Sequence, residues 1–480
     1  MKLFAKEWQI SMGFFERKYL PYIFLFFIVF ISRLPFLSAG YGIEEDSWGI
    51  ALAAFHTHFS SIYEPSRLPG HPVQEIIYSY LWGLGPIIFN GLSTIFSAIG
   101  TVFFALILKQ FQFKHFFIAS LTFAFIPAYY ISSTYTIDFV WTETFILISL
   151  YLLLKNKLIG CGLFLGLAIG CRITIGAMLF PFMIIIWQQN NWKQNSIHFL
   201  KILVPMVLVS VIVFIPVIAQ FGISFFTYYD QFPYPPISKV LYKMIPGVFG
   251  MIGIIAILIG IISIFLNRRK QMFGVLFKNK LETKIIYASI LVFILYCISY
   301  FRLPQKSGYM IPVIPFVIIL FGYYLTSNYF KLICILFIIS PFACSINLTD
   351  KLRGAAYSNF AYIFEVSGQE LFFDPFSGPI FSDYSKRKQK IKYTEYVINK
   401  TNAINSKTVI ISGWWYNEIM VTKMYQKENK SVTFEPYINE NKIKDYITKG
   451  YKLYYLPEQN IYNDEMYKMS ITDEVSKPFN

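Results

Sequence analysis

Long apolar runs separated by short polar segments fill the chain up to residue 347. Eleven of these runs come close to the roughly 20 mostly apolar residues that a helix needs to cross a bilayer. They lie at 20–37, 84–108, 116–131, 139–154, 158–171, 173–187, 201–219, 246–266, 285–301, 309–326 and 330–347. The fifth and sixth runs are short and meet at Gly170-Cys171-Arg172, so they form either one hairpin or a broken helix. The pattern predicts a polytopic α-helical membrane protein.

The last part of the chain, residues 348–480, changes to a polar sequence rich in Lys and Tyr. Its second half alternates between short strand-like runs and stretches with helical periodicity. The expected strands are 408–412, 431–434 and 451–455, and the expected helices are 417–426 and 441–448. This β-α-β-α-β order predicts a small parallel sheet. We therefore divide the chain into a transmembrane domain (1–347) and a small C-terminal α/β domain (348–480).

The composition agrees with a membrane protein. Of 480 residues, 55% are hydrophobic and 14% are charged, whereas a soluble domain carries roughly 25% charged residues. The 50 Phe and 35 Tyr also exclude a disordered chain. Five cysteines lie in or beside apolar runs, and none has the spacing to a second Cys or a His that a zinc site requires.

Lys and Arg are unevenly distributed over the segments between the apolar runs. With the N-terminus in the cytoplasm, seventeen lie inside and seven lie outside before residue 348, which is the excess that cytoplasmic loops carry. The net charge of +15 therefore reflects topology and not affinity for nucleic acid. Arg33 interrupts the first run, which favours an uncleaved anchor over a signal peptide. We expect a protein of the bacterial inner membrane with its C-terminal domain in the periplasm. The N-glycosylation acceptor sequences at Asn347, Asn399 and Asn429 keep an ER membrane as the alternative location.

Acidic residues gather on the outer side of this topology. They are Glu44, Glu45, Asp46, Glu64, Glu75, Asp138, Glu143 and Asp230. The first three follow the first apolar run and begin an Ala-rich stretch that we expect to form a short helix along the interface. A carboxylate there could accept a proton from an attacking hydroxyl as a general base. Two structural roles are the alternatives to catalysis. The acids at 44–46 could simply interact with the dipole at a helix N-terminus, and Asp138 could be a helix N-cap.

Four cations, Arg67, Arg172, Arg302 and Lys306, lie on the same side as these acids. Arg and Lys side chains at an outer membrane face could hold a phosphate or diphosphate, and the alternative is headgroup anchoring. His56 and His58 would point to different faces of a helix, which argues against a shared metal ion. The sequence predicts no cofactor with certainty, and it does not decide whether the protein needs a divalent metal ion.

These motifs resemble membrane glycosyltransferases of the C-type fold (GT-C), especially the group that uses polyprenyl-phosphate sugars and includes lipid A aminoarabinose transferases and protein O-mannosyltransferases. The resemblance covers about 20–347. Three of its motifs are the acids at 44–46, the segment Arg67-Leu-Pro-Gly-His-Pro72 and Asp138. The fourth is 162–174, which is similar to the family's segment Gly-Leu-Ala-x-Gly-x-x-x-Leu-Thr-Lys. The fifth is 302–315, which looks like the family's segment Arg-Tyr-x-x-Pro-x-x-Pro. The chain departs from the pattern by having Arg172 near the usual Lys position and three consecutive acids in the first motif.

The resemblance implies an inverting transfer, at the outer face, of a sugar from a polyprenyl-phosphate donor to a lipid, glycan or protein hydroxyl. Asp46, or Glu45 if the register shifts, would be the general base, and Asp138 would support it. The residues implied to hold the lipid phosphate are Arg67, His71, Arg172, Arg302 and Lys306. The sugar, the acceptor and the oligomeric state stay open.

Trp414 and Trp415 end the expected strand 408–412, at the edge where parallel sheets commonly bind ligands. We expect them to contact the acceptor, with the C-terminal domain capping the site. Core packing within the domain and insertion at the membrane interface are the alternatives.

Two other classes of function stay open. One is a lipid-linked saccharide flippase or other transporter, and the other is a membrane scaffold without catalytic activity. A transporter should show inverted repeats or buried charges near the midplane, and the sequence shows neither.

The predicted topology places Lys270 in the cytoplasm and Lys407 outside, because the positive charges are concentrated in the segments assigned to the inside. A membrane-impermeant thiol reagent should therefore label Lys407→Cys in intact cells and Lys270→Cys only after the membrane is opened. Labelling of both variants from the same side would contradict the eleven-span topology.

Overall fold

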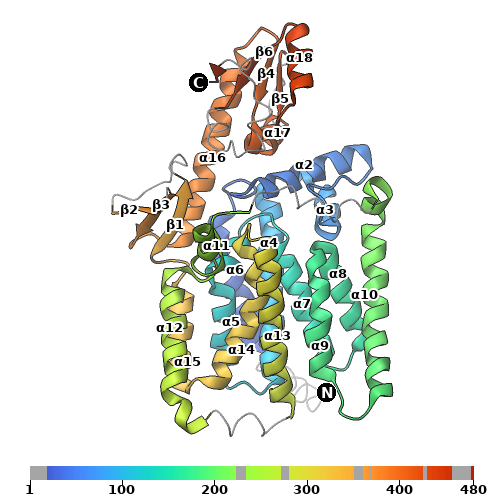
Figure 1. Ribbon diagram of the computed structural model, residues 1–480, viewed down its shortest axis with the longest axis vertical. Helices are drawn as coiled ribbons and strands as arrows, with labels where there is room; N and C mark the ends of the chain where they lie inside the picture. The colour runs from blue at the N-terminus through green and yellow to red at the C-terminus, as the bar shows by residue number, and fades with distance from the viewer. Residues whose placement is uncertain are drawn as a thin grey trace, which may run out of the picture.

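The computed structural model describes residues 19–222, 234–271, 280–350, 360–366, 369–424, 430–456 and 477–479. The protein is mostly helical. Its long helices run side by side, and two small sheets lie beyond one end of the bundle together with α2 (Glu45–Ser60) (Figure 1). We call this end the outer end, following the topology predicted above. Asp230, one of the predicted outer acids, lies outside the described residues.

Within the described residues, six helices are long and apolar enough to cross a membrane. They are Tyr19–Phe36, α4 (Pro86–Gln110), α10 (Trp192–Phe221), Pro246–Leu266 within α12 (Pro246–Gln271), Leu281–Arg302 within α13 (Lys280–Arg302), and Ser307–Tyr324, which ends with α14 (Ile314–Tyr324). The other five expected runs contain shorter apolar helices: α5 (Phe116–Phe125), α7 (Phe139–Leu154), α8 (Leu158–Cys171), Ile173–Ile186 ending with α9 (Leu179–Ile186), and α15 (Ser327–Ile339). A helical membrane protein is therefore supported, whereas the count of eleven spans stays a prediction.

Two of the shorter helices end where the backbone becomes extended. Ile126 has φ −62° and ψ 130°, as expected for a residue before proline, and Pro127 begins the separate helix α6 (Pro127–Ser132). Arg172 has φ −158° and ψ 112°, so α8 ends there and a 3-10 turn (Ile173–Met178) leads into α9. The fifth and sixth apolar runs are thus two separate helices. The break holds Arg172 at the outer end of the bundle.

The first helix is tied to the bundle by Arg33. This side chain is fully buried, donates to Ser133 Oγ at 3.1 Å and to the carbonyl oxygen of Ala124, and lies 4.1 Å from the ring centre of Tyr130. A buried guanidinium is tolerated only where its N–H groups have partners. Arg33 is therefore a packing element of the first helix.

The C-terminal segment forms two sheets joined by the long helix α16 (Pro379–Asn402). The first is antiparallel, with strands β1 (Ser345–Asp350), β2 (Tyr362–Val366) and β3 (Gln369–Asp374) in the order β1-β3-β2. The second has the order β5-β4-β6-β7 and contains β4 (Thr408–Ile411), β5 (Val432–Glu435), β6 (Lys452–Tyr455) and β7 (Lys477–Pro478). Helices α17 (Tyr416–Lys423) and α18 (Glu440–Thr448) connect its strands.

In the second sheet β4 is parallel to both β5 and β6. This confirms the predicted β-α-β-α-β order of the last part of the chain. The sequence did not predict the first sheet or α16. The Lys-rich run in the middle of α16 (386–392) is typical of a solvated surface and hides the helical spacing of its few apolar residues.

Helix α16 is fixed to the bundle through Arg387. Its side chain is 1% exposed, pairs with Asp383 at 2.8 Å, and donates to the carbonyl and hydroxyl oxygens of Thr134 at 3.3 and 3.2 Å. One turn later, Lys390 Nζ donates to the carbonyl oxygen of Ile43 at 3.0 Å. These contacts join the C-terminal segment to the loop that precedes α2. The C-terminal segment therefore covers the outer end of the bundle and does not hang free.

Candidate active site at the outer end

Helix α2 presents the first acidic motif. Glu44 is its N-cap residue, and Glu45 and Asp46 form its first turn, where the helix dipole favours negative charge. The side chain of Glu44 makes no capping hydrogen bond. Lys306 instead forms ion pairs with both Glu44 and Asp46. The predicted helix after the acidic motif is present, and Glu44 and Asp46 have specific cationic partners.

The loop before α3 (Pro72–Ser79) is held by one carboxylate. Glu75 is 1% exposed and accepts hydrogen bonds from the backbone N–H groups of Ser66 and His71 at 3.0 and 2.9 Å. The hydroxyls of Ser66 and Tyr63 also donate to it. Because all four bonds close on one side chain, Glu75 fixes the turn that carries Arg67 and His71.

Asp138 lies at the centre of the site. Its side chain has no exposed surface and makes no N-capping hydrogen bond, although it is the N-cap residue of α7. Its Oδ2 lies 2.9 Å from Arg172 Nη1, and its Oδ1 lies 3.7 Å from Arg67 Nη2. Burial acts to raise the pKa of Asp138, but the positive charges of His71 in its protonated form, of Arg172 and of Arg67 outweigh it and hold the pKa below its ordinary value. The N-cap interpretation is therefore wrong for this side chain.

Arg172 is held in place from two directions. Besides its bond to Asp138, the guanidinium lies 4.1 Å from the ring centre of Tyr309 and 4.8 Å from that of Phe139. Arginine stacks on aromatic faces while its N–H groups stay free to donate in the plane. The side chain is 15% exposed, so it is oriented but still reachable.

Arg67 connects the two halves of the site, because its guanidinium pairs with Asp46 as well as approaching Asp138. The result is one chain of ion pairs. It runs through Glu44, Lys306, Asp46, Arg67, Asp138 and Arg172. Three carboxylates and three cations from five separate segments thus meet in one small region.

His71 belongs to this region but differs from the cations. Its Nδ1 lies 3.8 Å from Asp138 Oδ2 and is hydrogen-bonded to the carbonyl oxygen of Cys171, so Nδ1 carries a proton. Its Nε2 is buried and, among the described residues, has no hydrogen-bond partner. Burial lowers the pKa of His71, with Asp138 opposing that effect. A neutral His71 offers a lone pair at Nε2, whereas the sequence predicts a phosphate-binding residue.

The C-terminal segment adds residues that the sequence did not single out. Asn417 Nδ2 of α17 donates to Glu45 Oε1 at 3.3 Å, and Lys390 pairs with Glu418 at 3.2 Å. Removal from water raises the pKa of Glu45 to about 8, although the charges of Lys390 and Arg67 act to lower it. Burial likewise raises the pKa of Glu44, against the charge of Lys243. The only indication of these partners in the sequence is the run of basic residues at 386–392.

A small cavity lies next to the first acidic motif. It has a volume of about 130 Å³, and Ile43, Tyr242, Asn347, Ser382, Asp383 and Lys386 are among the residues that line it. Its wall thus comes from the loop before α2, from the start of the C-terminal segment and from α16. Hydroxyl, amide, carboxylate and ammonium groups all face this space, which suits a small polyhydroxylated group.

Several predicted residues lie elsewhere. Arg302, the last residue of α13, is exposed, unlike the three cations of the ion-pair chain. Glu143, predicted among the outer acids, lies in the second turn of α7, is fully buried, and has no hydrogen-bond partner for either carboxylate oxygen among the described residues. His56 pairs with Glu64 at 3.0 Å. Within the described part of the chain, no group of three or more His, Cys, Asp or Glu side chains is arranged to hold a metal ion.

The two tryptophans occupy different environments. Gly413-Trp414-Trp415 forms a 3-10 turn after β4. Trp415 is 7% exposed and belongs to the core of the second sheet, with its ring centre 4.7 Å from that of Tyr393. Trp414 is 37% exposed. Core packing therefore accounts for Trp415, and Trp414 is the one that a ligand could reach.

Comparison of the sequence with protein-family models and with curated proteins finds no match.

The environments of the tryptophans predict different effects of substitution. Trp415→Ala should lower the free energy of unfolding by about 3 kcal/mol or more, as expected when a buried tryptophan leaves a cavity. Trp414→Ala should have a much smaller effect on the thermal unfolding midpoint measured in detergent. Equal losses in the two variants would contradict the assignment of Trp415 alone to the core.

Proposed function

We propose that the protein is an integral-membrane glycosyltransferase that moves a sugar from a polyprenyl phosphate to an acceptor hydroxyl on the outer side of the membrane. The observation that carries the proposal is the chain of ion pairs from Glu44 to Arg172. Its residues are far apart in sequence, lie on one side of the predicted topology, and match the motifs that resemble the GT-C group. Buried charges gathered in this way are expensive to maintain and are characteristic of functional sites.

The cations support binding of the lipid phosphate. Arg67 and Arg172 can each form two parallel hydrogen bonds to phosphate oxygens, and Lys306 adds a mobile positive charge. In the structure these cations are neutralised by Asp46, Asp138 and Glu44. A phosphate that binds between Arg67 and Lys306 would replace Asp46 as their counterion. Once its ion pairs are replaced in this way, Asp46 could accept a proton when the donor binds.

The reaction is a single displacement. The acceptor O–H gives its proton to Asp46, and the oxygen forms a bond to the anomeric carbon of the donor sugar. The bond between that carbon and the phosphate oxygen breaks, and the lipid phosphate leaves with the electron pair. The cations stabilise the negative charge that develops on it. Attack opposite to the leaving group inverts the anomeric centre.

The C-terminal segment supports a role in acceptor binding. Helix α17 covers α2 and contacts Glu45 through Asn417, while the polar cavity of about 130 Å³ begins at Ile43, next to Glu44. An acceptor sugar in this cavity would lie beside the acidic motif. The exposed face of Trp414 offers a further surface on which a sugar ring could stack.

The alternative of a lipid-linked saccharide transporter rests on Glu143, because an unpaired carboxyl inside a membrane helix is typical of transport pathways. The two proposals differ in their product. A transporter changes the side of the membrane on which the lipid-linked sugar lies, whereas a transferase forms a new glycosidic bond and releases the lipid phosphate.

Loss of the proposed base should abolish product formation. Mass spectrometry of lipids, glycans and proteins from a deletion strain would identify the product, and complementation would compare variants. Asp46→Asn should lower turnover by about 10²-fold or more, while Glu64→Gln, on the exposed outer acid paired with His56, should keep it. If Asp46→Asn is fully active and Glu45→Gln is not, Glu45 is the base. If neither substitution matters, or if no glycosylated product depends on the protein, the proposal is wrong.

The raised pKa of Glu45 predicts a pH-dependent effect. With a pKa of about 8, Glu45 is protonated at pH 6.5, and glutamine resembles that form. With Asp46 as the base, Glu45→Gln should change turnover by less than about 3-fold at pH 6.5, and the difference from the wild type should grow as the pH rises through 8. A large loss at pH 6.5 that disappears at high pH would contradict this assignment.

A further inference from the structure

The first sheet of the C-terminal segment has one apolar face. The register pairs Phe373 of β3 with Ile346 of β1 and with Tyr362 of β2. Two residues further along, Leu371 pairs with Leu348 and with Phe364. Because side chains alternate between the faces of a sheet, these two rows share one face. All six members of these two rows are apolar: Ile346, Leu348, Tyr362, Phe364, Leu371 and Phe373. The last row of the same face, Asp350, Val366 and Gln369, ends the apolar part of the face.

The opposite face has a different character. It carries Asn347, Glu370 and Glu365, together with Phe372 and Ile363. The Asn347 amide donates to Ser382 Oγ of α16 at 3.3 Å. This face is therefore mixed in polarity and contacts the rest of the C-terminal segment. The sheet as a whole is amphipathic.

In the described part of the chain the apolar face is only partly covered, since Ile346, Leu348, Leu371 and Phe373 are half-buried. The two residues on the edge strand β2 are the most exposed. Tyr362 is 61% exposed and Phe364 is 54% exposed. Next to the strands, Phe360 and Phe376 are 64% and 76% exposed, with ring centres 5.3 Å apart. An edge strand such as β2 with exposed apolar side chains promotes aggregation in water unless something covers it.

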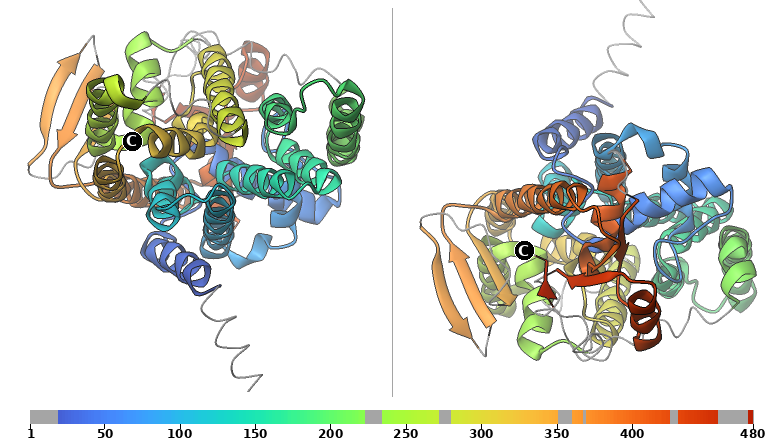
Figure 2. Two further views of the ribbon diagram at one scale, coloured as in Figure 1. Left: turned by 90° about the horizontal axis from the view of Figure 1, so that it is seen from below. Right: turned by 90° about the horizontal axis from the view of Figure 1, so that it is seen from above.

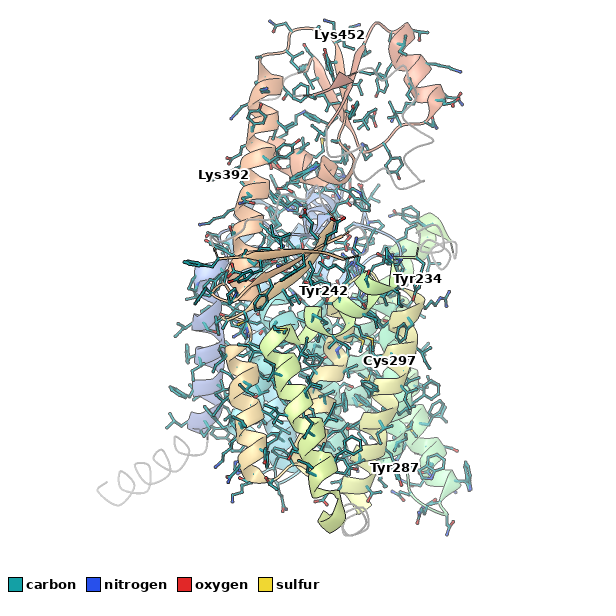
Figure 3. The ribbon with its side chains drawn as sticks, turned by 60° about the vertical axis from the view of Figure 1, so that its left-hand side comes forward. Tyr234, Tyr242, Tyr287, Cys297, Lys392 and Lys452 are labelled. Atoms are coloured by element: carbon teal, nitrogen blue, oxygen red, sulfur yellow. The ribbon has the colours of Figure 1, made fainter. Side chains whose placement is uncertain are left out.

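The place of the sheet in the fold indicates what covers it. Only Ser340–Cys344 separate β1 from the end of α15, and Tyr242, just before α12, donates to the carbonyl oxygen of Ile346 at 2.8 Å (Figure 3). The strands thus lie at the level of the outer ends of α12 and α15 (Figure 1). Both views of Figure 2 show them to one side of the helices and not above them. A bilayer around the bundle would meet the sheet at the boundary between headgroups and acyl chains.

The surface below the sheet is apolar in the same way. On α12, Leu258 and Ile262 are 52% and 55% exposed, and on α15 Ile335 is 48% exposed, as expected where membrane helices face lipid. The exposed aromatic residues of the sheet continue this apolar surface outward. Tyr and other aromatic side chains are favoured at the membrane–water interface.

We propose that this sheet inserts its apolar face into the outer leaflet of the bilayer and acts as a lipid anchor for the C-terminal segment. Its bond to α16 then links the lipid surface to the helix that carries Arg387 and Lys390, and so fixes the height of α17 over α2. The partner is a phospholipid surface. The inference depends on the membrane location of the helices and not on the proposed glycosyl transfer.

Neighbouring residues on β2 provide a matched test. Phe364 and Glu365 are both exposed and lie on opposite faces. Each would be replaced by Cys in a chain carrying Cys297→Ser and Cys344→Ser, since the other three cysteines are buried. A nitroxide at each position would be measured by electron paramagnetic resonance. The protein would be reconstituted in nanodiscs of phosphatidylethanolamine and phosphatidylglycerol, with oxygen and a water-soluble nickel chelate as relaxing agents.

We expect the ratio of oxygen to nickel accessibility at position 364 to exceed that at position 365 by about 3-fold or more, because oxygen partitions into the bilayer and the chelate does not. Equal access of the nickel chelate to both positions would show that the face is in water and would overturn the proposal. Shielding of position 364 from both agents would show that protein covers it, which would also overturn it. Matching thermal midpoints for the two labelled proteins establish that both are folded.

Discussion

The site is organised around a carboxylate that cannot stay buried alone. Asp138 has no exposed surface, and an isolated ionised carboxylate in a protein interior costs several kcal/mol even after relaxation of its surroundings. Its charge is compensated by Arg172 from the end of α8 and by Arg67 from the loop before α3. Arg67 in turn holds Asp46, and Asp46 holds Lys306. The need to neutralise charge in a region of low dielectric constant therefore brings five distant segments together.

The cations of this site are held by groups that leave them able to act on a ligand. Arg172 is oriented by the rings of Tyr309 and Phe139. Arg67 is positioned through its loop, which closes on Glu75. Positioning of this kind reduces the reorganisation needed when negative charge develops on a leaving phosphate. The carboxylates that neutralise the cations are then the groups that a phosphate would release for proton transfer.

The C-terminal segment changes the environment of the acidic motif. By packing on α2 it helps to bury Glu45, and burial raises the pKa of that carboxyl to about 8, while α16 contributes Lys390 on the same side. Exclusion of water strengthens every charge interaction beneath it. The amphipathic first sheet belongs to the same segment. If it binds lipid as we propose, one continuous stretch of chain both covers the acidic motif and contacts the membrane.

The sequence by itself determined the features that depend on local pattern. The apolar runs identify the helices, because a helix in lipid must be apolar along its whole length. The short strands and helices after residue 407 form as their periodicity predicts. The first acidic motif begins a helix, and Arg67, Arg172 and Lys306 do lie with Asp46 and Asp138. The residue types and their side of the membrane were sufficient to nominate these groups.

The tertiary structure decided which of these groups have partners. No local rule distinguishes Asp138 as a buried centre from Asp138 as an N-cap, because its partners are about 70 residues before it and more than 30 residues after it. The same holds for Arg302, which is exposed, and for Glu143, which is buried with no hydrogen-bond partner in the described part of the chain. The sequence did not predict the first sheet, because its edge strand β2 exposes Ile363 and Phe364 on opposite faces, so no alternation of apolar and polar residues marks that strand. Contacts between distant segments depend on the packed chain as a whole, and a pattern read along one segment does not contain them.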